Sequence, residues 1–408
     1  MQFAWMIAGL VLLGTLLSTF GALPHLWVFP LYPNLGLWLL ISAVDVTLAR
    51  FGTEDWRKLR PLLWGGGILW FTGAQGLPEV GIFLLALPPV LWVAQKRGSQ
   101  LLGPFCLVLL AGLFVGGHWE KLVHLGLPVE HWRFSVHLVA AFLFYRLASW
   151  AMAYARGERA SFLATMEYFL APAFWLSPLH AAYLTRLQPG TVAAGNSCGW
   201  ILRGFAHAVV FGVLFSWAAP LLAEWYAGGL VSFLSWRFPA AGVLLFLIAY
   251  LEKSRVSYVA AGFLSLAGWK VEPDFRAPWL AQSLPEYWRR FHFWVWEFYV
   301  DIIFGPLSVW LARRVGPAAA LRLSLLLTFF LGTTVSHYIS YPAPLLVTAG
   351  LGLLFGLVTM LHTFGQERLP RPLGVGLTWI SVWFLYLLAY PAFGLGWGWG
   401  EWGRFFGV

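Results

Sequence analysis

The run Pro344-Leu-Leu-Val-Thr-Ala-Gly-Leu-Gly-Leu-Leu-Phe-Gly-Leu-Val-Thr-Met-Leu361 has eighteen residues and no charged side chain. A helix that crosses the hydrocarbon core of a bilayer needs about 20 predominantly apolar residues. Comparable runs recur from Phe3 to the C-terminus, with no long polar domain between them. The run therefore predicts a transmembrane helix, and it is typical of the whole chain.

The composition agrees with this interpretation. Of the 408 residues, 60% are hydrophobic and only 11% are charged. A water-soluble chain cannot hide that much apolar surface. In lipid, only helices and closed barrels satisfy every backbone amide, and these runs are too long and continuous for alternating barrel strands. The sequence predicts an all-α, polytopic helical membrane protein with a single domain, 1–408.

The expected architecture has about 11–12 transmembrane or re-entrant helices, because several of the apolar runs are short for a full crossing. The candidate spans are 3–22, 31–49, 61–76, 79–94, 101–117, 137–155, 161–184, 205–223, 230–250, 317–333, 344–361 and 374–392. The first lacks a basic leader and a small-residue cleavage site, so it is interpreted as a retained span.

Basic clusters between the spans predict the orientation. Two crossings separate the first basic cluster, within 50–60, from Lys96 and Arg97, so both clusters lie on the same side of the membrane. The positive-inside rule makes this side cytoplasmic. Arg156 and Arg159 fall on the same side. The expected location is therefore the cell membrane, inner or plasma, with several crossings. The first cluster consists of Arg50, Arg57, Lys58 and Arg60.

Counting crossings further along the chain then conflicts with the positive-inside rule, because it places Glu252, Lys253 and Arg255 on the side opposite to the cytoplasm. The conflict disappears if one segment between 160 and 225 does not cross, so we expect a half-helix there, lining a cavity.

Other classes of function are disfavoured. The net charge of +9 comes from short clusters between apolar runs, as expected for loops, which argues against nucleic-acid binding. Cys106 and Cys198 are too few for a disulfide framework and lack metal-ligand spacing. Gly195-Asn-Ser-Cys-Gly199 matches a nucleophile-elbow pattern, but that motif requires a strand-to-helix turn and no strand is predicted here. No metal site is expected.

The region 252–342 is the most highly charged part of the chain and is the expected catalytic motif region. Ser283-Leu-Pro-Glu286 is a capping-box pattern and predicts the start of a helix. The helix should continue to Val300 as an interfacial amphipathic helix with one shared stripe. That stripe contains Arg289, His292, Trp296 and Tyr299.

The motifs in this region resemble those of the membrane-bound O-acyltransferase family, in particular its bacterial branch of alginate O-acetylases and teichoic acid D-alanyl transferases. The resemblance rests on Asp274-Phe-Arg-Ala-Pro-Trp-Leu-Ala281, Ser283-Leu-Pro-Glu-Tyr-Trp-Arg-Arg-Phe-His292, Asp301 and a lone histidine in a later apolar segment, His337. It covers about 65 residues and the segment around His337. Two motifs differ: Thr334-Val-Ser-His337-Tyr replaces G-x-W-H-G, and no acid follows Ser257-Tyr258.

The resemblance implies that His337 is the catalytic histidine and that His292 is the second histidine of the reaction tunnel. It also implies a set of residues that line the substrate tunnel or bind the donor: Arg276, Trp288, Arg289, Arg290 and Asp301. Four neighbours in the stripe or beside His337 complete the expected set: Trp296, Tyr299, Ser336 and Tyr341.

The chemistry of His337 supports such a role without the resemblance. Ionisable residues at membrane depth are usually functional, and an imidazole that titrates near neutrality suits a base that takes a hydroxyl proton during acyl transfer. The alternative is a histidine hydrogen-bonded to a neighbouring helix, and for His292 an interfacial histidine. Arg289 and Arg290 suit donor phosphates, or alternatively reach the polar interface. The lone histidines 137, 180, 207 and 362 are expected to have packing or capping roles.

The expected function is transfer of an acetyl or similar small acyl group from a cytoplasmic thioester to a hydroxyl of a cell-envelope polysaccharide, polymer or lipid. His337 would be the general base. No bound cofactor is expected, and an acyl-CoA or acyl carrier protein thioester is the co-substrate. The expected partners are the bilayer, the acyl donor, and a carrier protein or an extracytoplasmic partner. The alternative function is a multi-pass transporter or flippase for a lipid-linked or small polar substrate, with histidines and arginines along its path.

Overall fold

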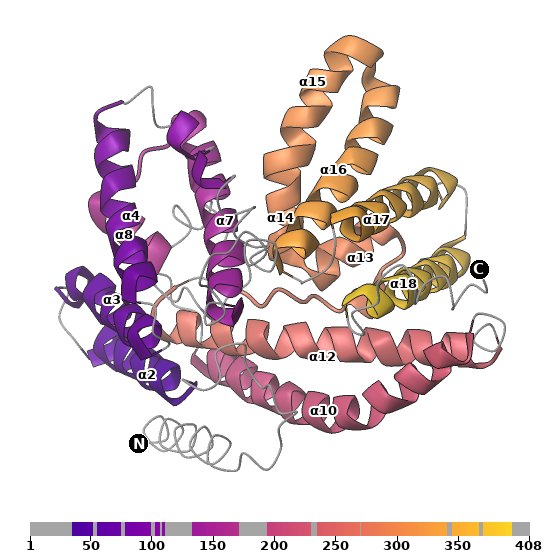
Figure 1. Ribbon diagram of the computed structural model, residues 1–408, viewed down its shortest axis with the longest axis horizontal. Helices are drawn as coiled ribbons and strands as arrows, with labels where there is room; N and C mark the ends of the chain where they lie inside the picture. The colour runs from indigo at the N-terminus through magenta and orange to yellow at the C-terminus, as the bar shows by residue number, and fades with distance from the viewer. Residues whose placement is uncertain are drawn as a thin grey trace, which may run out of the picture. The chain divides into compact units, whose positions relative to one another are not determined.

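The computed structural model describes residues 35–51, 55–74, 78–98, 103–106, 108–110, 133–170, 194–229, 235–269, 271–340, 345–366 and 370–393. Helices make up most of these ranges, and no β-strand occurs within them (Figure 1). The all-α prediction is confirmed.

Five helical stretches in the described ranges are long and apolar enough to cross a membrane, so the protein is a polytopic membrane protein. Two shorter apolar helices cover 40–49 and 80–96. The predicted span 3–22 lies outside the described residues, and the total of 11–12 helices stays a prediction. The five stretches are 196–227, 293–315, 317–335, 345–364 and 371–391.

The chain divides into two compact units whose boundaries fall inside two long helices, α10 (Ala194–Ala227) and α12 (Arg237–Leu266). Unit 1 comprises 1–209 and 254–273, and unit 2 comprises 210–253 and 274–408. The predicted catalytic region 252–342 contributes to both units. Whether the chain functions as one domain stays a prediction.

In the described part of unit 1, the longer helices besides its parts of α10 and α12 are α2 (Leu35–Phe51), α3 (Trp56–Ala74), α4 (Pro78–Lys96), α7 (Arg133–Ala155) and α8 (Phe162–Leu170). The side-chain amide of Gln95, near the end of α4, donates a 3.1 Å hydrogen bond to the backbone carbonyl of Ala160, just before α8. This bond joins the chain near Lys96 to the turn after Arg156, two basic segments that the sequence places on one side.

The structure places Glu252, Lys253 and Arg255 inside α12, which continues for 30 residues. The predicted half-helix between 160 and 225 stays a prediction. Of the predicted span 161–184, the described part is the nine-residue α8, and the rest lies outside the described residues.

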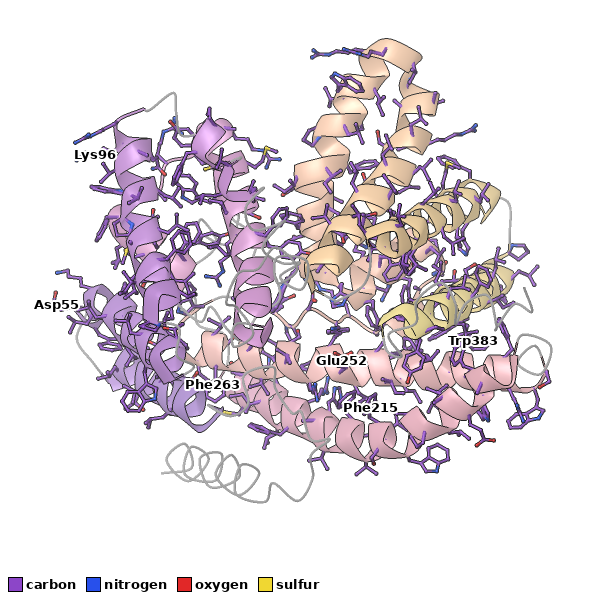
Figure 2. All side chains as sticks on the ribbon, viewed as in Figure 1. Asp55, Lys96, Phe215, Glu252, Phe263 and Trp383 are labelled. Atoms are coloured by element: carbon purple, nitrogen blue, oxygen red, sulfur yellow. The ribbon has the colours of Figure 1, made fainter. Side chains whose placement is uncertain are left out.

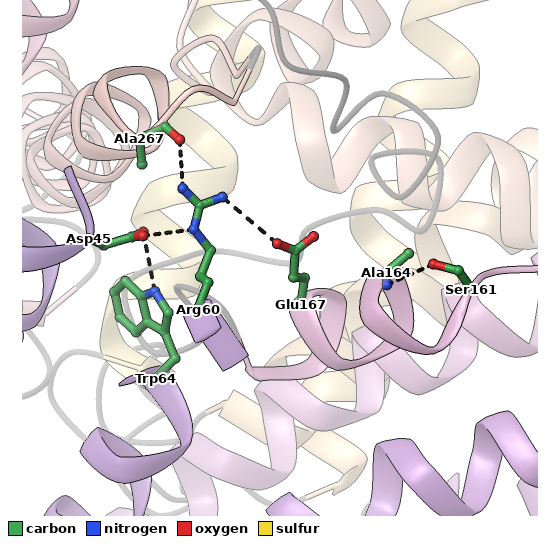
Figure 3. A network of polar contacts seen from close by, with 7 residues as sticks. All are labelled: Asp45, Arg60, Trp64, Ser161, Ala164, Glu167 and Ala267. Carbon is green, nitrogen blue, oxygen red and sulfur yellow. Dashed lines mark hydrogen bonds and ion pairs between the residues drawn. The ribbon is translucent and has the colours of Figure 1, made fainter. Parts of the chain in front are cut away.

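Arg60 is also not a loop residue, contrary to the sequence prediction, because it lies inside α3 and is buried. Its Nε donates to Oδ1 of Asp45 at 2.7 Å, and its Nη2 donates to the carbonyl of Ala267 at 2.8 Å (Figure 3). Trp64 donates to the second oxygen of Asp45 at 3.3 Å, and Glu167 lies 3.8 Å from Nη1. A charge in an apolar bundle needs such partners, so this network fixes α2, α3 and α8 to the end of α12.

Unit 2 holds its parts of α10 and α12 together with the C-terminal helices. Its core mixes aliphatic and aromatic side chains. Trp383 of α18, labelled in Figure 2, lies so close to Gly242 of α12 that a Cβ atom there would come within 2.6 Å of the indole. The helices are η3 (Pro278–Leu280), α13 (Leu284–Phe291), α14 (Phe293–Tyr299), the π-helix η4 (Val300–Phe304), α15 (Gly305–Val315), α16 (Pro317–Ser340), α17 (Leu345–Gln366) and α18 (Arg371–Phe393).

We expect the substitution Arg60→Met to lower the free energy of unfolding by about 3 kcal/mol, because it leaves the Asp45 carboxylate buried without its cation. Thermal unfolding of the detergent-purified protein measures this. Lys58→Met is the matched control, since Lys58 pairs with Asp55 on the exposed surface, where ion pairs contribute little, and it should leave the stability close to the parent's. Equal stability of the two variants would contradict the structural role of Arg60.

Candidate functional site

Helix α13 begins where the capping-box pattern predicts. The Ser283 hydroxyl accepts a 3.3 Å hydrogen bond from the Glu286 amide, and Oε2 of Glu286 accepts a 2.8 Å bond from the Gln282 amide. Glu286 also pairs with Arg290, one turn later, at 2.8 Å. The start of the helix is therefore fixed by the residues that the sequence singles out.

Histidine 362 adds a second cap to the same helix end. The amide of Leu284 donates to Nδ1 of His362 at 3.4 Å, and Nε2 of His362 lies 3.3 Å from the hydroxyl of Thr378. Because Nδ1 accepts, the proton of the neutral imidazole is on Nε2 and points to Thr378. The predicted capping role of His362 is confirmed.

The prediction of one continuous helix from Ser283 to Val300 is wrong, because the chain breaks at His292. Its backbone angles, φ −142° and ψ 70°, are not helical, and they end α13 and precede α14. Arg289 therefore lies on a different helix from Trp296 and Tyr299, so these residues do not form one stripe with His292.

A buried carboxylate occupies this break. Oδ2 of Asp274 lies 2.8 Å from Nδ1 of His292, and Oδ1 accepts the amide proton of Trp294 at 2.5 Å. The backbone carbonyl of Asp274 also accepts from the Phe293 amide at 3.1 Å. Asp274 thus binds the first residues of α14 and the histidine before them.

The arrangement determines how His292 carries its proton. A carboxylate is an acceptor, so Nδ1–H must donate to Asp274, and Nε2 of the neutral ring is left with a lone pair. No hydrogen bond to this Nε2 occurs among the described residues, and the side chain is 22% exposed. A histidine oriented in this way by a carboxylate is a suitable general base.

Aromatic side chains surround the dyad of His292 and Asp274. Phe275 and Phe291 lie with ring centroids 5.3 and 5.0 Å from that of His292. Trp288 extends this surface to Phe355 of α17, at 5.7 Å, and Trp296 extends it to Phe329 of α16, at 6.2 Å. The dyad therefore lies among apolar rings, where a charge on the imidazole is stabilised mainly by Asp274.

The π-helix η4 contains the predicted residue Asp301 and joins α14 to α15. Just before it, the ring of Tyr299 lies directly on Gly332 of α16, where a Cβ atom would come within 2.6 Å of the ring. Tyr299 lies seven residues after His292, and Gly332 lies five before His337. The contact thus brings the two histidine-bearing segments together. Each histidine lies within about 10 Å of the contact, measured along its own segment.

The backbone of His337 lies in α16, as does that of Ser336, but their side chains and the whole of Tyr341 fall outside the described residues. The predicted pairing of the two imidazoles stays a prediction. The other predicted site residues all lie in unit 2, on α13 and the segments next to it.

The predicted arginines differ in their surroundings. Arg290 pairs with Glu286 and donates to the carbonyl of Arg276 at 3.2 Å. The guanidinium of Arg276 covers the ring of Phe293 at 3.7 Å, and Arg289 is exposed on α13. Arg290 therefore braces the motif, whereas Arg289 points away from the core.

Asp274 is the candidate site residue that the sequence prediction missed. It opens the first quoted motif, but it lies 18 residues before His292, so no helical spacing connects the two. Glu272 and Arg276 lie close to it in the sequence, so its charge alone does not single it out. Within the described residues, no group of three or more His, Cys, Asp or Glu side chains could hold a metal ion.

Comparison with protein-family models gives no match for this chain, and comparison with curated proteins gives none either.

We expect acidification to weaken the start of α13. Burial alone would raise the pKa of Glu286, but hydrogen bonds from Gln282 and Arg290, with the charges of Arg290 and Arg289, hold it below its ordinary value of 4.5. A depressed carboxyl pKa stabilises the fold above pH 4.5, and this stability is lost as the pH falls through the folded pKa.

Thermal unfolding of the protein and of Glu286→Gln at pH 7 and pH 4 measures this contribution. The difference in melting temperature between the two proteins should shrink at pH 4. An equal difference at both pH values would contradict a stabilising role of the Glu286 charge.

Gly332→Ala should lower the free energy of unfolding by about 1–3 kcal/mol, because its methyl group overlaps the ring of Tyr299. The same substitution in a Tyr299→Leu background should be less destabilising, since the ring is gone. Denaturation of the four proteins gives the coupling between the two sites, and additive effects would argue against the contact.

Proposed function

We propose that the protein is a membrane-bound O-acyltransferase, which moves a small acyl group such as acetyl from a thioester to a hydroxyl of an envelope polysaccharide, polymer or lipid. The observation that carries this proposal is the buried Asp274 carboxylate, which holds Nδ1 of His292 and leaves Nε2 available. The quoted motifs support the same class through their resemblance to the family.

In the proposed reaction, Nε2 of His292 removes the proton of the acceptor hydroxyl as its oxygen attacks the thioester carbonyl. The C–O bond forms and a tetrahedral intermediate results. When the C–S bond breaks, the imidazolium returns its proton to the leaving thiolate. The acyl group is then an ester of the acceptor, and the imidazole is neutral again.

Asp274 is a positioning residue in this scheme, since it acts through His292. Its carboxylate fixes the tautomer that leaves Nε2 as an acceptor, and it stabilises the imidazolium formed during attack. Because its other oxygen accepts from the Trp294 amide, the carboxylate cannot rotate away without weakening the start of α14.

The resemblance assigns the base to His337, whereas the described geometry favours His292. We propose that both act on the substrate, with His292 as the base and His337 as the second catalytic histidine. The Tyr299–Gly332 contact supports this, because it keeps the two segments adjacent. The chemistry requires no bound cofactor, and the donor we propose is acyl-CoA or an acyl carrier protein, used at the cell membrane.

The test is transfer of radiolabelled acetyl from acetyl-CoA to an envelope fraction, catalysed by the purified protein and measured as alkali-labile label. His292→Ala should lower the rate by about 100-fold or more, the usual contribution of a general base. Asp274→Asn should lower it by about tenfold or more, because the amide no longer fixes the tautomer. His337→Ala should also be strongly impaired.

The pH dependence of the activity distinguishes a positioning role of Asp274 from a role in folding alone. Loss of the carboxylate destabilises the imidazolium, so the activity that remains in Asp274→Asn should reach its plateau at lower pH than in the parent. Arg313→Gln, an exposed change at the end of α15, is the control and should keep full activity. Parent-like transfer by His292→Ala would refute the base assignment.

A further inference from the structure

Arg203 lies on an outer face of α10 in unit 1, away from the dyad. It is exposed, and α10 also exposes the apolar side chains of Leu202, Val209 and Val210. A surface of this composition suits the acyl chains of lipids rather than water. An arginine on it requires a partner for its charge.

The described residues provide no acidic partner. Arg203 has no carboxylate within ion-pair distance among them, and its contacts are with Tyr258 of α12. Its Nη1 lies 3.5 Å from the Tyr258 hydroxyl, and its guanidinium lies 5.3 Å from the ring centroid. The phenol orients the guanidinium, but no described residue compensates its charge.

The support under Arg203 is rigid. Gly204 lets α12 approach so closely that a Cβ atom there would lie 2.8 Å from the carbonyl oxygen of Arg255. One turn later, Nδ1 of His207 lies 2.7 Å from the Ser254 hydroxyl, and its ring meets that of Tyr258 edge-on at 5.4 Å. The two helices therefore hold the Tyr258 platform in a fixed position.

The position of Arg203 along α10 matches the level of lipid headgroups. Residues 204–223 contain no Asp, Glu, Lys or Arg, and they are followed by the exposed Glu224. This stretch of 20 residues is about 30 Å long as a helix, the thickness of a hydrocarbon core. Arg203 and Glu224 thus mark its two ends, so a bilayer centred on this stretch would have phosphate groups at the level of Arg203.

We propose that Arg203 and Tyr258 form a binding site for the phosphate group of a membrane phospholipid, with anionic headgroups preferred. The guanidinium fork matches phosphate oxygens, the buried tyrosine holds the guanidinium from below, and the exposed apolar side chains of the same helix contact the acyl chains. Since no acid among the described residues pairs with the guanidinium, a lipid of net charge −1 is bound more tightly than a zwitterionic one.

Native mass spectrometry of the full chain, released from detergent with added phosphatidylglycerol or phosphatidylcholine, measures this binding. The parent protein should bind phosphatidylglycerol more tightly, and Arg203→Gln should weaken that binding about fivefold, the ratio that corresponds to the roughly 1 kcal/mol per arginine at an anionic surface. Because Arg203 is exposed and makes no ion pair with a described residue, the variant should unfold at the parent's temperature.

Arg313→Gln is the matched control, since it removes an equally exposed arginine from α15, and it should retain parent-like affinity. Millimolar inorganic phosphate should not displace the lipid, because the acyl chains contribute to binding. The proposal is overturned if Arg203→Gln and the parent bind phosphatidylglycerol equally, if Arg313→Gln loses as much affinity, or if free phosphate competes fully. In the parent alone, equal binding of the two lipids would overturn the preference for anionic headgroups.

Discussion

The Asp274 carboxylate is the constraint on which the candidate site depends. A chain that stops being helical at His292 exposes amides that have no water to bond to inside an apolar bundle. One carboxylate resolves this, because it accepts from the Trp294 amide and from the imidazole at once. The break in the helix and the orientation of the proposed base thus share one stabilising partner.

The sequence predicts the parts of this arrangement that depend on local chemistry. Ser283 and Glu286 cap α13 as their spacing indicates, and the long apolar runs become helices. The sequence does not predict the break at His292, because aromatic residues continue the pattern on both sides of it. The partnership with Asp274 joins distant segments, and periodicity carries no information about such pairs.

The same limit explains the misinterpreted charges. The sequence predicts a loop at Arg60, and the count of crossings treats Glu252, Lys253 and Arg255 as lying outside the membrane, because charges usually do. All four lie in helices, and Arg60 is buried where Asp45 and the Ala267 carbonyl compensate its charge. Arg203 lacks such partners among the described residues and faces outward instead. An arginine in an apolar helix is thus compatible with two environments, and tertiary contacts decide between them.

The π-helix at Val300–Phe304 has a consequence for how this chain tolerates insertions and deletions. A π-turn accommodates one residue more than an α-turn, so removing a single residue there would restore a regular helix and rotate everything before it by about 100° relative to α15. Tyr299 would then leave Gly332, and the segment carrying His292 would face another direction. In homologous chains, the length of this short segment should therefore vary less than that of the surrounding turns.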